Sequence, residues 1–312
     1  MDASKLSGIH CVLYALFDRQ ERIDRGLMRL QIDAVLAAGV SGVTVLGLAT
    51  EVGKLSAGER VQLMQSTASD VGGRLPLSIT INGASVAEQI EQVRAAEDCG
   101  ADWLILQPPA VGIYPASEYI EFFGRVADAA RKPVAIQNAP AYFGRGLTAA
   151  ELSLLFSRHP ALKVIKGEGP AVDIEQMIAT VGAGVPVFNG RGGLEMLDSL
   201  RAGCAGLILA PDLVDRAART YAAFRGGDID EAERLYAGSL PAIVFIMQSL
   251  ETLIVYGKRL FVRRAGLPEV FDRGPAGRPT AFGLSIIDRF AQDLGPFGAS
   301  ATITAQNLQG EQ

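Results

Sequence analysis

Cysteine and histidine are both scarce in this chain of 312 residues. Its three cysteines, Cys11, Cys99 and Cys204, are odd in number and far apart, which favours free thiols in a reducing compartment over disulfides. The two histidines, His10 and His159, are too few for a histidine-rich metal site or an obvious Ser/His/Asp triad. No metal or phosphate motif is evident, so we expect neither a metal nor an organic cofactor. Acid–base chemistry then has to come from lysine, glutamate, tyrosine or bound water.

Long apolar runs and concentrated basic charge are also missing. The run IVFIMQSLETLIVY carries Gln248 and Glu251 in its middle and falls short of the roughly 20 apolar residues of a membrane span. The apolar stretch near the N-terminus stops at Asp18, which is too short for a secretory signal. The net charge of −5 argues against nucleic acid as the main partner. We therefore expect a cytoplasmic protein that binds neither membranes nor nucleic acid.

Eight short runs rich in β-branched residues alternate with longer amphipathic stretches. The runs cover residues 8–14, 42–47, 77–82, 102–107, 133–138, 162–167, 185–190 and 205–210. Eight strands that alternate with helices over short connections are typical of a TIM (β/α)8 barrel, with an open doubly wound sheet as the main rival. Ser56 with Glu59, and Thr148 with Glu151, fit the capping box at two of the predicted helix starts.

The strand pattern stops after residue 211. The remaining sequence predicts helices over residues 212–226, 229–250, 252–265 and 279–294. We therefore predict a barrel over residues 1–226 and a C-terminal helical region over 227–299. Residues 300–312 are polar and lack periodicity, which predicts a loose tail.

The segment LKVIKGEG places a lysine and a carboxylate at the end of the sixth predicted strand. Alternate side chains of a strand share a face, so Val164, Lys166 and Glu168 point the same way. In a low-dielectric barrel interior the lysine loses its proton readily and becomes a nucleophile toward a carbonyl, while the carboxylate can move protons on the bound molecule. A structural ion pair is the alternative. Because the chain has six lysines against 23 arginines, generic surface charge explains Lys166 poorly.

A second candidate site follows the strand that ends at Gly47. Backbone amides of the loop Leu48, Ala49 and Thr50 can form a nest for a carboxylate, and the Thr50 hydroxyl can add a donor. An ordinary connection between a strand and a helix is the alternative for this loop.

Taken together, four segments resemble the superfamily of dihydrodipicolinate synthase and N-acetylneuraminate lyase, the Schiff-base-forming lyases on a TIM barrel. GVTVLGLATEVGKLS is similar to the family's strand followed by Gly-Thr-Thr-Gly-Glu, PVAIQNAP to its Tyr-Asn-x-Pro strand, LKVIKGE to its Schiff-base strand and VFNGRGG to its glycine-rich seventh strand end. The order and spacing of all four match over about residues 7–265.

This resemblance implies a small-molecule 2-keto acid substrate, which Lys166 binds covalently with Glu168 beside it. The implied substrate-binding residues are Gly47, Leu48, Ala49, Thr50, Gln137, Asn138, Gly190 and Arg191. Arg191 also fits a solvated or interface position. The resemblance further implies a homotetramer built from dimers.

The departures from the family pattern exclude some of the family's reactions. Leu48 and Ala49 stand where two threonines are usual, and Gln137 stands where the catalytic tyrosine belongs. Pro109 and Ala110 replace paired tyrosines after the fourth strand, and Tyr142 replaces an expected arginine. Because glutamine cannot deliver a proton as tyrosine can, we expect no dihydrodipicolinate synthase activity.

Lys166 with Glu168 suits a dehydratase. The motif IKGE and the sequence QNAP resemble the subgroup that includes 2-keto-3-deoxyarabonate dehydratases. We therefore predict dehydration of a 2-keto-3-deoxy sugar acid. Retro-aldol cleavage of a similar acid is the first alternative, since it shares the iminium intermediate. A non-catalytic barrel that senses a keto acid is the second.

Overall fold

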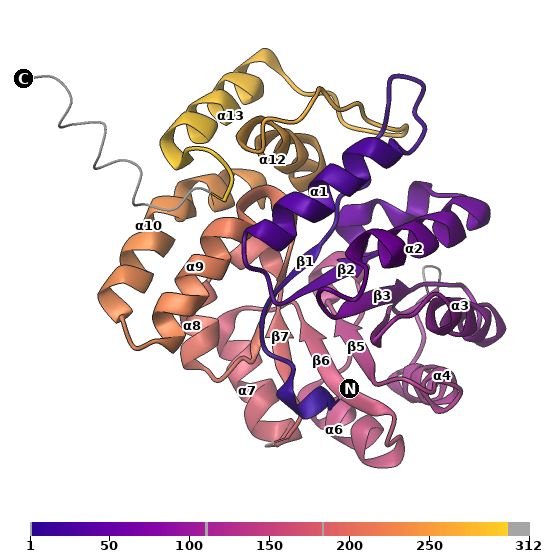
Figure 1. Cartoon of the computed structure of the whole chain (residues 1–312). Coiled ribbons are helices and arrows are strands. Elements are labelled where there is room, and N and C mark those ends of the chain that lie inside the picture. Colours follow the sequence, from indigo (N-terminus) through magenta and orange to yellow (C-terminus); the bar gives the residue numbers. More distant parts are fainter. Residues whose placement is uncertain (1, 110–111, 183, 299–312) are drawn as a thin grey trace, which may run out of the picture.

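Eight parallel strands close into a barrel in the computed structural model, which describes residues 2–109, 112–182 and 184–298 (Figure 1). The strands are β1 (Gly8–Val12), β2 (Gly42–Val45), β3 (Leu77–Ile81), β4 (Trp103–Leu106), β5 (Val134–Asn138), β6 (Leu162–Gly167), β7 (Val187–Asn189) and β8 (Gly206–Leu209). Each pairs with the next along the chain, and β1 closes on β8 with His10 opposite Ile208. The predicted TIM barrel is confirmed, and the rival open sheet is wrong.

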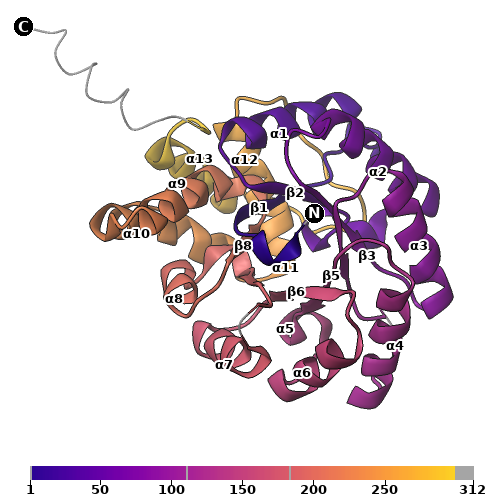
Figure 2. The same ribbon diagram turned by 60° about the horizontal axis from the view of Figure 1, so that its bottom comes forward.

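Helices form a ring around the strands (Figure 2). They are α1 (Arg25–Ala37), α2 (Ala57–Val71), α3 (Val86–Asp98), α4 (Ala116–Asp128), α6 (Ala149–Arg158), α7 (Ala171–Val181), α8 (Met196–Arg201) and α9 (Val214–Arg225), with a short α5 (Pro140–Phe143) directly after β5. Both predicted capping boxes are present, at Ser56 for α2 and at Thr148 for α6. In each, the hydroxyl and the glutamate three residues later satisfy backbone amides that the helix leaves unpaired.

Strand register decides which side chains fill the barrel interior. Trp103 of β4 and Phe188 of β7 meet His10 of β1, with ring centroids 5.6 and 5.2 Å from the imidazole. Gln137 is paired with Lys166, which in turn is paired with Phe188. Alternation then points Lys166 inward from near the carboxyl end of β6, the end at which TIM barrels carry their active sites.

The C-terminal region consists of α10 (Ile229–Ile246), α11 (Leu250–Thr252), a π-helical turn (Leu253–Gly257), α12 (Lys258–Arg264) and α13 (Ala281–Leu294). The predicted helix over 229–250 is too long, because Ser249 caps a new helix by accepting a hydrogen bond from the Thr252 amide. The predicted helix over 212–226 begins with a 3-10 turn, Pro211–Leu213. The division at residue 226 stays a prediction, and both Ala110 and the predicted tail over 300–312 lie outside the described residues.

Membrane-spanning potential is limited in the part of the chain that the structure describes. No single helix there is long and apolar enough to cross a bilayer. The segments Ile229–Ile246 and Leu250–Arg264 meet the length and composition criterion only when taken together, and a bend of 110° separates them.

A buried ion pair fastens α12 to the start of α9. Both nitrogens of the Arg264 fork donate to the Asp215 carboxylate, at 2.9 and 2.6 Å, and the side chains are 0% and 4% exposed. Arg264 also donates to the carbonyl oxygens of Asp212 and Gly295. The C-terminal helices are thus held against the barrel by a bidentate charge pair that is shielded from water.

We expect Arg264→Met to lower the free energy of unfolding by about 3–5 kcal/mol, because Asp215 would remain as an uncompensated buried charge. Urea denaturation followed by circular dichroism measures this loss. The double variant Arg264→Met/Asp215→Leu should recover a large part of it. Arg234→Met, which breaks the exposed pair with Glu231, is the control and should leave the free energy of unfolding nearly unchanged. If the double variant is as unstable as the single one, the carbonyl contacts of Arg264 rather than the charge pair carry the stability.

Candidate active site

Four polar side chains from β6 and the ends of β4 and β5 form one connected chain inside the barrel. Lys166 Nζ lies 3.2 Å from Glu168 Oε1, and the two side chains are 5% and 8% exposed. Gln137 Nε2 donates to the same glutamate oxygen at 2.5 Å. Gln107 Nε2 in turn donates to Gln137 Oε1 at 2.9 Å. An amine and a carboxylate are therefore held in hydrogen-bond range in a nearly dry environment, as the strand alternation predicted.

This chain of side chains opens into a cavity of about 40 Å³. Its lining residues are Val12, Leu48, Ala49, Tyr142, Lys166, Glu168, Arg191, Gly192, Ile208, Leu209, Ala210, Met247, Leu250 and Leu253. Most of them are apolar, so functional groups that can bond to a ligand are concentrated at Lys166, Glu168, Tyr142 and Arg191. Met247, Leu250 and Leu253 belong to the C-terminal region, which thereby forms one wall of the cavity.

Tyr142 and Arg191 are the two other polar side chains of the cavity. Burial raises the pKa of Tyr142 to about 12, and the nearby negative charge of Glu168 adds to the shift. The phenol therefore keeps its proton at neutral pH and can act as a hydrogen-bond donor. Arg191 is paired with Glu195 at 2.7 Å, which orients its guanidinium at the edge of the cavity. An interface role for Arg191 is not needed to explain its position.

The loop after β2 has contacts that sequence analysis did not anticipate. Leu48–Thr50 forms a 3-10 turn, and the Thr50 hydroxyl donates to the Leu13 carbonyl oxygen at 2.6 Å. The hydroxyl proton is thus used within the protein, and its predicted donation to a substrate is not supported by this geometry. Leu48 and Ala49 line the cavity, and their contact with a substrate stays a prediction. Gly47 serves close packing, because a Cβ there would lie 2.7 Å from Val12 Cγ2.

Glu51, directly after this turn, ties the loop to two lysines. It has a left-handed conformation with φ 54°, and its buried carboxylate accepts hydrogen bonds from Lys258 of α12 and, at 2.7 Å, from Lys54. The Lys258 side chain is fully buried, and burial lowers the pKa of its amine while Glu51 opposes the shift. Sequence analysis missed this pair because 207 residues separate its members.

Asn138 and Gly190 lie beside the cavity in supporting positions. Asn138 Nδ2 donates to the Leu147 carbonyl oxygen at 2.9 Å, and its Oδ1 accepts from the Leu147 amide at 2.8 Å. The side chain therefore fixes the backbone that follows α5, and its contact with a substrate stays a prediction. A Cβ at Gly190 would lie 2.9 Å from Glu168 Cγ. Glycine at this position lets the chain after β7 approach the glutamate closely.

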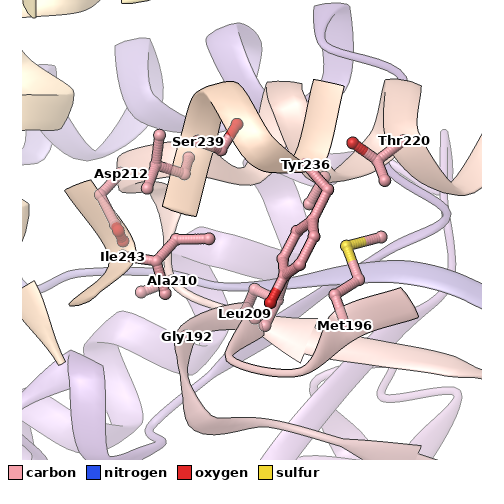
Figure 3. Close-up of a pocket in the computed structure, with 12 residues that line it drawn as sticks. Gly192, Met196, Leu209, Ala210, Asp212, Thr220, Tyr236, Ser239 and Ile243 are labelled. Carbon is pink, nitrogen blue, oxygen red and sulfur yellow. The ribbon is translucent and has the colours of Figure 1, made fainter. Parts of the chain in front are cut away.

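A second cavity of about 10 Å³ shares Gly192 with the cavity at Lys166 (Figure 3). Burial raises the pKa of Asp212 in its wall to about 6, and a hydrogen bond of 2.8 Å from Tyr14 opposes the shift. Met196 of α8 and Tyr236 of α10 point toward one another across this space (Figure 3). It has room for about one water molecule.

We expect Gly190→Ala to displace the Glu168 side chain, because the new methyl group would collide with Cγ and Cδ. A crystal structure of the variant should show the distance from Lys166 Nζ to Glu168 Oε1 lengthened beyond 3.2 Å. Gly58→Ala is the matched control, since no atom lies within 4 Å of a Cβ at that position in α2. A structure of the Gly190→Ala variant in which Glu168 has not moved would contradict this reading of the glycine.

Comparisons with known proteins identify the family to which this chain belongs. The family model described as the dihydrodipicolinate synthetase family matches residues 5–267. The Escherichia coli (strain K12) protein named "Probable 2-dehydro-3-deoxy-D-pentonate aldolase YjhH" is 27% identical over 274 residues, which are 85% of this chain and 89% of that protein. The L-2-keto-3-deoxyarabonate dehydratase of Azospirillum brasilense is 26% identical over 242 residues, 76% of this chain and 78% of that protein. The crystal structure of YagE from E. coli K12 in complex with pyruvate has a TM-score of 0.86 at 24% identity, covering 93% of this chain and 98% of that one. The chain therefore belongs to the dihydrodipicolinate synthetase family, as its four sequence motifs predicted.

Proposed function

We propose that the protein is a Schiff-base lyase that dehydrates a 2-keto-3-deoxy sugar acid. The observation that carries this proposal is the buried pair of Lys166 and Glu168, 3.2 Å apart. A nucleophilic amine with an adjacent proton carrier meets the two chemical needs of an imine-based elimination. Membership of the dihydrodipicolinate synthetase family and the names of the aldolase and dehydratase relatives support imine-based chemistry on a 2-keto acid.

In the proposed reaction the Lys166 amine adds to the C2 carbonyl of the substrate. Loss of one water molecule from the resulting carbinolamine gives an iminium, which acidifies the protons on C3. Glu168 removes a C3 proton to form an enamine, and the enamine expels the C4 hydroxyl with the proton that Glu168 returns, directly or through water. Hydrolysis of the imine consumes the first water molecule again and releases the amine. The net change is the loss of one water molecule from the substrate.

The remaining polar groups of the cavity have supporting roles in this proposal. The amide of Gln137 replaces the family's tyrosine and can hold a hydroxyl or the carbinolamine, but it cannot titrate. Tyr142 keeps its proton and can donate to a hydroxyl of the substrate. Arg191 can reach a hydroxyl or carboxylate, and the backbone amides at Leu48 and Ala49 can receive the C1 carboxylate.

Retro-aldol cleavage is the alternative reaction, and the name of the E. coli relative YjhH favours it. It would start from the same iminium and differ in the proton removed, which would come from the C4 hydroxyl instead of C3. A non-catalytic keto-acid sensor is the alternative of a different class. The proposal also includes a homotetrameric assembly and a cytoplasmic location.

We expect pyruvate and borohydride to add mass irreversibly to a peptide that contains Lys166, because reduction traps the imine. Mass spectrometry after proteolysis measures the adduct. Lys166→Ala should abolish it, while Lys163→Ala, which removes the exposed lysine of the same strand, should leave it intact.

The location of the adduct decides between the alternatives. Labelling at Lys54 or Lys163 would overturn the assignment of the nucleophile. Reversible pyruvate binding without any trapping would support a sensor. Condensation of pyruvate with aspartate semialdehyde is the negative control for reaction type and should be negligible.

We expect Glu168→Gln to lower the dehydration turnover by about 100- to 10,000-fold, the usual contribution of a positioned general acid–base group. Glutamine preserves the shape of the side chain but removes the base, so borohydride trapping should survive at Lys166. Turnover is measured by product formation from 2-keto-3-deoxy sugar acids of different chain length. Dehydration at nearly the parental rate would make Glu168 a structural partner of the lysine only.

A further inference from the structure

The buried glutamine at the end of β4 has no role in the reaction proposed above. Gln107 follows the last residue of this strand and is 3% exposed. We propose that Gln107 is a positioning residue, which fixes the orientation of the Gln137 amide and thereby holds Glu168 as a hydrogen-bond acceptor beside Lys166. This inference rests on the proposed function for its kinetic consequence, although its structural part can be tested without substrate.

Glu168 determines the direction of the hydrogen bonds that link Gln107, Gln137 and Glu168. An ionised Glu168 can only accept, so Gln137 has to present its NH₂ group to it. The Gln137 carbonyl oxygen then faces Gln107, which has to donate. A side chain that donates at position 107 is therefore coupled to an ionised carboxylate at position 168, although the two residues do not touch.

Backbone contacts hold Gln107 in place for this task. Its carbonyl oxygen accepts from Gln89 Nε2 at 2.9 Å, and its amide donates to the Ile81 carbonyl oxygen at 3.0 Å. Neighbouring elements α3 and β3 thus hold both sides of the peptide. The side chain can hardly withdraw from Gln137 without leaving a buried amide unpaired, which costs about 1–3 kcal/mol for a buried polar group.

The charged and titratable groups around Glu168 make the amide orientation important. Lys166 approaches from its own strand, Tyr142 from α5 and Arg191 from the turn after β7. Asp173 of α7 lines a third cavity, of about 440 Å³, which Glu168 also lines. A Gln137 amide that turned over would place its carbonyl oxygen against the carboxylate. The protonated form of Glu168 would then be favoured, since only that form can donate to an oxygen. A glutamate that stays protonated cannot remove a C3 proton.

Two variants of Gln107 test this coupling in opposite ways. Gln107→Met keeps the length of the side chain and removes the donor, so that only the bond to Glu168 still favours the parental orientation of the Gln137 amide. Gln107→Glu replaces the donor with an acceptor that competes for the Gln137 NH₂ group, which favours the turned orientation. The effect should therefore increase from the parent to the methionine variant and again to the glutamate variant.

The first measurement needs no substrate. Carboxyl ¹³C NMR of protein labelled at glutamate, with the Glu168 signal assigned by its loss in Glu168→Gln, follows protonation of Glu168 against pH. The titration midpoint should move upward by about one pH unit in Gln107→Met, the equivalent of one hydrogen bond to a charged group, and further in Gln107→Glu. Midpoints that coincide in all three proteins would overturn the proposal.

The second measurement is kinetic. In both variants the acid limb of the pH–rate profile for dehydration should move in the same direction as the NMR midpoint, and kcat should fall by about 10- to 100-fold. KM and borohydride trapping at Lys166 should change little, because the nucleophile stays in place. A fall in kcat with no movement of the acid limb would assign Gln107 a merely structural role and overturn the proposal.

Gln31→Met is the matched control for the loss of a buried amide. Gln31 is fully buried and exchanges hydrogen bonds of 3.0 Å with the backbone of Tyr14, away from Glu168. This variant should lose stability without any change in the Glu168 titration. Failure of the proposed function remains distinguishable, because a parent protein that dehydrates no keto acid would refute the function while the NMR titration still decides the role of Gln107.

Discussion

The close approach of Lys166 to Glu168 inside a dry barrel is the constraint on which the rest of this site depends. Two opposite charges taken out of water carry a desolvation cost that their attraction offsets only with good geometry and further hydrogen bonds. Gln137 supplies such a bond at 2.5 Å, and glycine at position 190 leaves room for the carboxylate. Gln137 and Gly190, which are distant in sequence, therefore both support the short contact between Lys166 and Glu168.

The same requirement explains how distant parts of the chain cooperate. Closing the cavity above Lys166 needs an apolar wall, and Met247, Leu250 and Leu253 of the C-terminal region supply it. That region has to be held in place against the barrel. The buried pair of Lys258 with Glu51 ties α12 directly to the loop that carries Leu48 and Ala49. One electrostatic contact thus fixes two walls of the cavity relative to each other.

Much of the fold and the centre of the site could be predicted from the sequence, because both depend on local periodicity. The period of two residues placed Lys166 and Glu168 on one face of β6, and capping boxes marked the starts of α2 and α6. Contacts between distant segments left no such signal. The Lys258–Glu51 pair and the wall formed by Met247 depend on how the C-terminal helices dock.

The partners of side-chain hydrogen bonds also could not be predicted from the sequence. The Thr50 hydroxyl has several acceptors within reach of an unfolded chain, and only the folded loop selects the Leu13 carbonyl oxygen. The two bonds of Asn138 with Leu147 likewise become visible only in the folded structure. Gln107 gave no signal at all, because its importance comes from the direction of a hydrogen-bond chain that spans three strands.

The replacement of a tyrosine by Gln137 links this geometry to the choice of reaction. A phenol can shuttle a proton to and from a carbinolamine or an alcohol, whereas an amide can only orient its neighbours. In the proposed reaction proton movement is then concentrated at Glu168, because it lies 3.2 Å from the amine that would hold the keto acid. Tyr142 remains as a donor that keeps its proton, suited to holding a hydroxyl but poor as a base. In the proposed reaction a base next to the amine favours removal of a C3 proton and departure of the C4 hydroxyl over deprotonation of that hydroxyl.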